Sequence, residues 1–209
     1  MQFGLGIVGA GGHAQVVIAT LRSMGLSPDA AFDDDTARMG HDVLGVRIVG
    51  TIADALASGS PLHLAIGSNL LRQTLAAKRQ NGPWVTALHA RALVESATQI
   101  GEGTLVTMGA LVQVTARVGR HAIINTGAIV EHDCVIGDFA HLASGAKLAG
   151  GVIIGNGAML GVGAQVLPGI SVGAGAVVGA GAVVVRSVPA GAVVVGVPAK
   201  VLQGAIARP

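Results

Sequence analysis

Aliphatic side chains recur every six residues through the C-terminal half of the chain. Steps of six from Val94 to Val184 meet sixteen positions, and each one is Val, Ile or Leu. In most repeats a small residue stands two places before the aliphatic one, and Gly often follows it. Neither a helical period of 3.6 nor a strand alternation of two gives this spacing. Six-residue repeats are typical of a parallel β-helix.

The repeat predicts which residues stack on one another. Each six residues supply one short strand and a turn, and three such sides close a coil of 18 residues, so 94–184 make five coils. The aliphatic residues point inward, and glycine suits the tight turns. The uncharged stretch from Leu148 to Val185 is therefore a stack of coils, although its hydropathy alone suggests a membrane span.

Residues 1–87 follow a different pattern, in which apolar strands alternate with helices. It predicts strands at 3–8, 62–66 and 84–88, a further strand that ends at 31–32, and helices at 13–24 and 69–80. This order is typical of a Rossmann-like βαβ domain with a parallel sheet. We therefore expect an α/β domain at 1–87 and a β-helix domain with a C-terminal tail at 88–209.

A glycine-rich turn, Gly9 to Ala14, joins the first strand to the first helix. Glycine amides at a helix N-terminus suit a phosphate or pyrophosphate. Asp33 and Asp34 follow the second strand, where they can accept hydrogen bonds from a ribose or base. A dinucleotide-dependent redox enzyme also needs a second mononucleotide half, for which residues 1–87 leave no room. We therefore expect a nucleotide-linked substrate rather than NAD.

Composition narrows the class of protein. Aromatic residues make up only 2% of the chain, so small aliphatic residues must build the core. The 13 basic and 11 acidic residues are scattered, which argues against a nucleic-acid surface. The single cysteine, Cys134, excludes an internal disulfide and a Cys-rich zinc site. The first residues lack the basic region of a signal peptide, so we expect a cytoplasmic protein with no membrane segment.

Charge within the repeats is concentrated around Glu131-His132-Asp133. A histidine can take a proton from an attacking amine or hydroxyl near neutral pH, and an adjacent carboxylate can orient the ring. Gly150 lies one coil after His132, so it would leave a gap for a thioester and offer its N–H to an oxyanion. His132 and Asp133 are therefore the candidate catalytic residues.

Several motifs together resemble one family of sugar acyltransferases. They are the six-residue repeats, the Gly-Gly-His turn, the paired aspartates, the segment Ile66-Gly67-Ser68-Asn69-x-x-Arg72 and the tail Gly196 to Val201. The chain resembles, over essentially its whole length, the left-handed β-helix family of sialic acid O-acetyltransferases and nucleotide-linked amino-sugar N-acetyltransferases. Family members commonly have Ser at the position of Gly11. The resemblance implies a left-handed β-helix, acetyl-CoA as cosubstrate, no metal, and a homotrimer whose neighbouring subunits share the site.

The resemblance also implies roles for individual residues. His132 would be the general base, and Asp133 would raise its basicity. The phosphates of the substrate would face Gly11, Gly12 and His13, the nucleoside Asp33 and Asp34, and the sugar Gly67. Acetyl-CoA would be bound by His141, Ser144, Gly150, Val162 and Ala180.

We predict an acetyl-CoA-dependent N-acetyltransferase that acts on the amino group of a nucleotide-linked amino sugar. A close alternative is O-acetylation of sialic acid, since His132 would serve either acceptor. A zinc enzyme similar to the gamma carbonic anhydrases would need an H-x4-H pair, whereas His121, His132 and His141 are 11 and 9 residues apart. A non-catalytic nucleotide-binding scaffold is a third class. The nucleotide base, the sugar and the amine position stay open.

Overall fold

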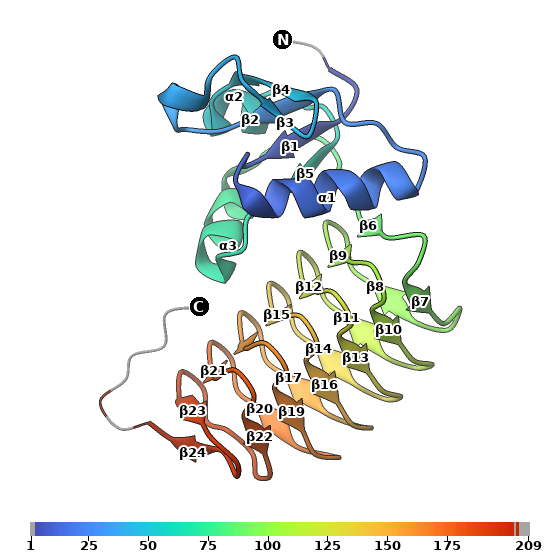
Figure 1. The fold of residues 1–209 in the computed structure, drawn as a ribbon, viewed down its shortest axis with the longest axis vertical. Coiled ribbons are helices and arrows are strands. Elements are labelled where there is room, and N and C mark those ends of the chain that lie inside the picture. The colour runs from blue at the N-terminus through green and yellow to red at the C-terminus, as the bar shows by residue number, and fades with distance from the viewer. Residues whose placement is uncertain (1–2, 203, 205–209) are drawn as a thin grey trace.

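The computed structural model describes residues 3–202 and residue 204. Figure 1 shows an α/β domain at one end of a long β-helix. The domain contains β1 (Gly6–Val8), α1 (Gly12–Ser23), β2 (Ala30–Phe32), a 3-10 turn (Thr36–Arg38), β3 (Asp42–Val43), β4 (Val46–Gly50), α2 (Ile52–Ala57), β5 (Leu62–Leu64) and α3 (Asn69–Lys78). The predicted fold class, an α/β domain followed by a parallel β-helix, is confirmed.

The α/β domain is a sheet covered by helices on both faces. Its strand order is β3-β4-β2-β1-β5, and all neighbours are parallel except the β3–β4 pair. Alternate strand residues point to opposite faces. Ile7 and Ala31 pack with α1, while Val8 and Phe32 pack with residues of α2 and α3. The apolar strand residues are thus buried on both faces of the sheet.

The loops after β1 and β5 meet at the edge of the sheet where the strand order reverses. Gly9 has φ +93°, and a Cβ there would lie 2.8 Å from Ile66 Cγ1 and 3.2 Å from the Ala65 carbonyl oxygen. Only glycine fits this contact. Such a switch point is where open α/β sheets bind their ligands.

The β-helix has three faces, numbered here in chain order. The first face contains β6 (Ala87–Leu88), β9 (Leu105–Val106), β12 (Ile123–Ile124), β15 (His141–Leu142), β18 (Met159–Leu160), β21 (Val177–Val178), β23 (Val193–Val195) and β24 (Lys200–Val201). The second face contains β7 (Leu93–Val94), β10 (Leu111–Val112), β13 (Ile129–Val130), β16 (Lys147–Leu148), β19 (Gln165–Val166) and β22 (Val183–Val184). The third face contains β8 (Gln99–Ile100), β11 (Arg117–Val118), β14 (Val135–Ile136), β17 (Ile153–Ile154) and β20 (Ser171–Val172).

The register of the strands gives the length of a coil. Ile123 pairs with His141, Ile129 with Lys147 and Val135 with Ile153, each 18 residues apart. The second residue of most of these strands is a buried aliphatic side chain that fills the interior of the coil. Cys134 takes one of the small positions and is buried too. No helix in the part of the chain described is long and apolar enough to span a bilayer.

One predicted strand belongs to a different sheet from the one expected. The strand expected at 84–88 was assigned to the α/β domain, but only Trp84 bridges to that sheet, at Leu62. Ala87–Leu88 forms β6 and pairs with β9 of the β-helix. Leu88 lies six residues before Val94 and therefore continues the repeat, so the predicted domain boundary falls inside β6.

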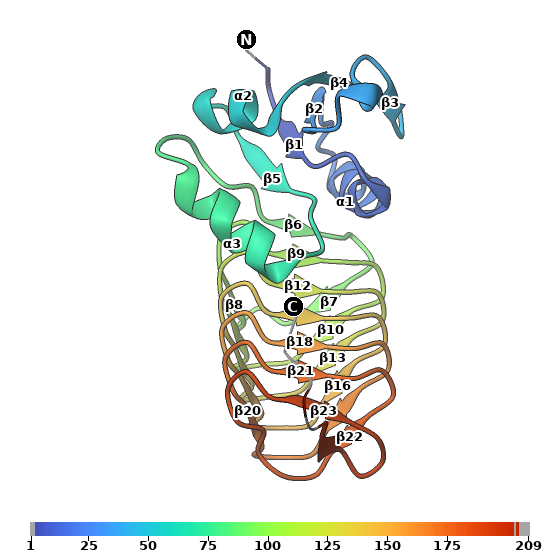
Figure 2. The same cartoon turned by 90° about the vertical axis from the view of Figure 1, so that its left-hand side faces the viewer.

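The α/β domain rests on the first coils of the first face. Leu105 and Ile123 point outward from that face and pack into the same cluster as α1. Figure 2 shows α3 running beside these coils, next to β9 and β12. Polar groups are buried at this junction as well, namely those of His63, Asn69, Arg72, His121 and His141.

We expect acid to destabilise the folded chain. Burial lowers the pKa of His63, His121 and His141 to about 4. In the unfolded chain a histidine titrates near pH 6.5, so between about pH 6.5 and 4 the unfolded state binds more protons. The free energy of unfolding should therefore fall by about 2 kcal/mol or more from pH 7 to pH 5.

Urea unfolding at pH 7 and pH 5 measures this difference. His121→Leu removes one of the titrating groups and should reduce the pH dependence. Equal stability of the wild-type protein at the two pH values would contradict the prediction.

Candidate functional site

His132 and Asp133 form a hydrogen-bonded pair in the turn between β13 and β14. His132 Nδ1 lies 2.8 Å from Asp133 Oδ2, and both side chains are exposed. If Nδ1 carries the proton and donates it to the carboxylate, Nε2 is left free to accept one. This hydrogen bond, together with one from Thr115, holds the pKa of Asp133 below its usual range. The pair thus has the geometry of a general base and the group that orients it.

Thr115 supports this pair from the preceding coil and was missed by the sequence reasoning. Its hydroxyl donates to Asp133 Oδ1 at 2.7 Å and accepts from the Asp133 backbone N–H at 3.1 Å. Thr115 stands 18 residues before Asp133, so the coil length was the signal that could have found it.

Gly150 lies against His132 from the following coil. A Cβ at Gly150 would come 2.6 Å from both Cε1 and Nε2 of the imidazole, so a larger residue there would force the His132 ring to move. The Gly150 N–H donates no hydrogen bond to any described residue. A groove of about 260 Å³ runs beside this position and is lined by Ile129, Glu131, Lys147, Leu148, Ala149, Gln165, Val166 and Leu167.

His141 occupies a different environment, on the first face under the α/β domain. It is buried, and its Nε2 lies 3.3 Å from Asn125 Nδ2. Its Nδ1 has no hydrogen-bond partner among the described residues, and neither has Nε2 of His13. Burial, followed by the charge of Arg72, lowers the pKa of His13. Burial, Arg72 and His13 together lower that of His141 to about 4.

The fold places His132 and His141 on opposite sides of one coil. His132 stands at the corner between the second and third faces, which is opposite the first face that carries His141. The aliphatic core lies between them. Ser144, Val162 and Ala180 form a stack at another corner, between the first and second faces, where Gly163 and Gly181 donate to the carbonyls of Ser144 and Val162.

The predicted nucleotide residues surround the switch point of the α/β sheet. Gly11 is the N-cap of α1 and makes no side-chain cap. A Cβ at Gly11, Gly12 or Gly67 would meet nothing within 4 Å, so the space over these backbones is open.

Asp33 and Asp34 both accept backbone hydrogen bonds within the domain. Asp33 accepts from Ala10 at 2.7 Å and from Asp35 at 3.0 Å, and Asp34 accepts from Ile52 at 2.9 Å. Asp33 thereby fixes the glycine turn to the end of β2.

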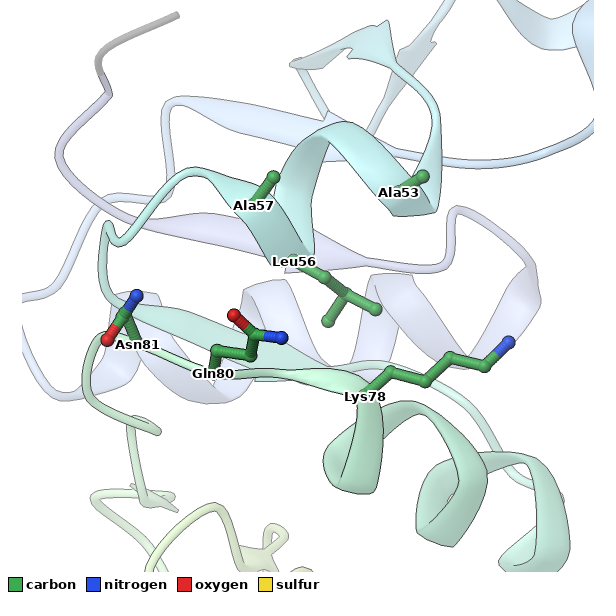
Figure 3. Close-up of a pocket in the computed structure, with 6 residues that line it drawn as sticks. All are labelled: Ala53, Leu56, Ala57, Lys78, Gln80 and Asn81. Atoms are coloured by element: carbon green, nitrogen blue, oxygen red, sulfur yellow. The ribbon is translucent and has the colours of Figure 1, made fainter.

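Another cavity lies away from these groups. It measures about 440 Å³ and is lined by Ala53, Leu56, Ala57, Lys78, Gln80 and Asn81. Figure 3 shows it between α2 and the end of α3, with no imidazole or carboxylate among its lining residues. In the described part of the chain, no three His, Cys, Asp or Glu side chains are grouped to hold a metal ion.

Comparison with known proteins identifies the family. Residues 4–79 match the PglD N-terminal domain, and residues 151–186 match the bacterial transferase hexapeptide (six repeats). The chain is 43% identical to perosamine N-acetyltransferase from Caulobacter crescentus, over 96% of this chain and 97% of that one, with a TM-score of 0.91. The chain belongs to the family of hexapeptide-repeat sugar N-acetyltransferases. The Caulobacter structure, a histidine mutant, holds CoA and GDP-perosamine.

Two further relatives match different fractions of the length of this acetyltransferase. The acetyltransferase domain of PglB from Neisseria gonorrhoeae, in complex with acetyl coenzyme A, is 34% identical over 97% of this chain and all of that one, with a TM-score of 0.88. Uncharacterized protein L142 of Acanthamoeba polyphaga mimivirus is 31% identical over 101 residues, which is 48% of this chain and 20% of that protein.

Removing the Thr115 hydroxyl should slow acetyl transfer without weakening the binding of either substrate. In Thr115→Val the Asp133 carboxylate loses a donor and is free to leave His132. We expect turnover to fall about tenfold, which corresponds to about 1.4 kcal/mol and matches the loss of one hydrogen bond to a charged group. Thr98→Val is the control, because its hydroxyl donates to the Gln113 carbonyl and makes no hydrogen bond with Asp133 or His132. Steady-state kinetics measure both, and unchanged turnover in Thr115→Val would show that Asp133 needs no support.

Proposed function

We propose that this protein transfers the acetyl group of acetyl-CoA to the amino group of a nucleotide-linked amino sugar, and that GDP-perosamine is the first acceptor to test. The observation that carries the proposal is the His132–Asp133 pair placed against Gly150. It stands in a chain 43% identical, almost end to end, to an enzyme whose structure holds CoA and GDP-perosamine. No observation favours the hydroxyl of sialic acid as acceptor.

The reaction uses groups that the coil already aligns. As the sugar nitrogen attacks the thioester carbonyl, His132 Nε2 takes the proton that the amine loses. The negative charge that develops on the carbonyl oxygen is stabilised by the Gly150 N–H. Collapse breaks the C–S bond, and the imidazolium returns the proton to the sulfur of CoA. Asp133 stabilises the imidazolium between these steps.

The nucleotide is bound at the switch point of the α/β sheet. Its diphosphate lies over the amides of Gly11 and Gly12 at the N-terminus of α1, where backbone N–H groups and the helix dipole favour an anion. The open space over these glycines and the lack of a side-chain cap support this placement. Gly67, on the neighbouring loop, faces the sugar, and His13 lies beside the phosphates.

Each active site is shared between two copies of the chain in a homotrimer. His132, Asp133 and Gly150 of one copy face His141 and the stack of Ser144, Val162 and Ala180 on the next. The support is the position of the two histidines on opposite sides of a single coil. Apolar side chains left outside the coil, including Val135 at 39% exposure and Ile153 at 48%, favour contact with another copy.

Replacing His132 should remove most of the activity and leave binding intact. General-base catalysis contributes about 10²- to 10⁴-fold, so His132→Asn should lose that much turnover. The assay follows release of the CoA thiol with GDP-perosamine, and with UDP- and dTDP-linked amino sugars in parallel. Titration calorimetry checks that acetyl-CoA still binds.

His41→Asn is the matched control, because His41 is exposed on the α/β domain. Turnover close to wild type in His132→Asn would refute its role as the base. Binding of acetyl-CoA without acetylation of any of these amino sugars would refute the acceptor class.

A further inference from the structure

Arg72 is buried where α3 meets the β-helix, with only 1% of its surface exposed. Its guanidinium makes five hydrogen bonds, all to neutral oxygens. The acceptors are the carbonyls of His121 (3.1 Å), Ile66 (3.0 Å), Gly67 (2.8 Å) and Phe139 (2.9 Å), and the Asn69 side-chain oxygen (2.8 Å). These bonds use every N–H that an arginine side chain offers. Arg72 therefore ties the loop after β5 to the corner of two coils.

Among the described residues, the charge of Arg72 has no carboxylate partner. All eleven Asp and Glu residues lie in the described part of the chain, and none comes within 4.0 Å of its guanidinium. Burial lowers the pKa of Arg72 to about 9, so it stays a cation near neutral pH. A buried cation without a counter-charge is costly, and hydrogen bonds to carbonyls satisfy its donors but do not cancel its charge.

The uncompensated charge lies beside the switch point. Two of its acceptors, the carbonyls of Ile66 and Gly67, belong to the loop that contacts Gly9. Its charge also contributes to the lowered pKa of His13, in the first turn of α1. The histidines around it are held neutral by burial, so they add no second charge.

From these contacts we infer that Arg72 supplies the counter-charge for the diphosphate of the nucleotide substrate, acting through space while its hydrogen bonds hold the two domains in register. The inference rests on the nucleotide site of the proposed function. Because every N–H of Arg72 is already bonded, it is a positioning residue that need not touch the phosphates. A low-dielectric junction transmits its charge more strongly than water would. Arg72 therefore makes the site bind a nucleoside diphosphate in preference to the uncharged nucleoside.

Titration calorimetry with GDP and with guanosine tests the inference. Arg72→Met removes the charge and the hydrogen bonds, whereas Arg72→Lys, titrated at pH 6 to keep the buried lysine protonated, retains the charge and loses most of the bonds. Asn69→Ala is the matched control, since it removes the Asn69 side-chain bonds to the Gly157 and Ala158 carbonyls and one of the five Arg72 hydrogen bonds, and leaves the charge of Arg72 in place. We expect the preference for GDP over guanosine to fall roughly tenfold in Arg72→Met and to persist in Arg72→Lys and Asn69→Ala.

The outcomes distinguish an electrostatic role of Arg72 from a purely structural one. If Arg72→Met keeps the full preference, or if Arg72→Lys loses it, the role of Arg72 is structural and the inference is overturned. The Arg72→Lys variant distinguishes the two roles even if the Arg72→Met protein does not fold. If the wild-type protein binds no nucleoside diphosphate, the nucleotide site of the proposed function falls, and the inference falls with it.

Discussion

The 18-residue register of the coils is the constraint on which the proposed acetyl-transfer site depends. It places Thr115 under Asp133 and Gly150 over His132, so three consecutive coils build the proposed base, the hydroxyl that supports its carboxylate and the glycine against which its ring packs. Parallel pairing repeats this register without a break from β7 to β22. A single inserted residue would move His132 off Gly150 and turn an aliphatic side chain outward. The regularity of the sequence is therefore a requirement of the site as well as of the core.

The second constraint is the junction between the domains. Apolar side chains of α1 and the first face supply its area, while Arg72 and Asn69 fix its orientation through hydrogen bonds to backbone carbonyls of the coils. Backbone carbonyls at coil corners are rigid acceptors, since the same coils are held by their own strand pairing. The glycine turn that would receive the nucleotide is thus held at a fixed place relative to the coils that carry His141.

Much of this could be predicted from the sequence, because one repeat governs half of the chain. Six-residue spacing was enough to predict the coil, the inward aliphatic residues and the stacking of Gly150 on His132. Thr115 could have been found by the same step. The α/β domain was harder, because β3, β4 and α2 are short and gave no clear period. Strand 84–88 was misassigned because Leu88 belongs to the repeat.

Other features depend on contacts that the spacing of residues along the sequence does not predict. The acceptors of Arg72 come from segments up to 67 residues away and are mostly backbone carbonyls, which carry no sequence signal. The separation of His132 from His141 was visible in principle, since nine residues are half a coil and lead to the opposite side. Only the fold shows that the two histidines lie on opposite sides of one coil, which is the basis for proposing a shared site.

The proposal that copies of the chain share each active site is tested most directly by mixing subunits that each lack one of the two histidines. His132→Asn and His141→Asn chains are unfolded together, refolded in equal amounts and assayed for acetyl transfer. In a closed trimer, random assembly leaves about one interface in four with both histidines intact, so activity should return to roughly a quarter of wild type. Activity that stays at the level of the separate variants would contradict a shared site, because both histidines would then act within one chain.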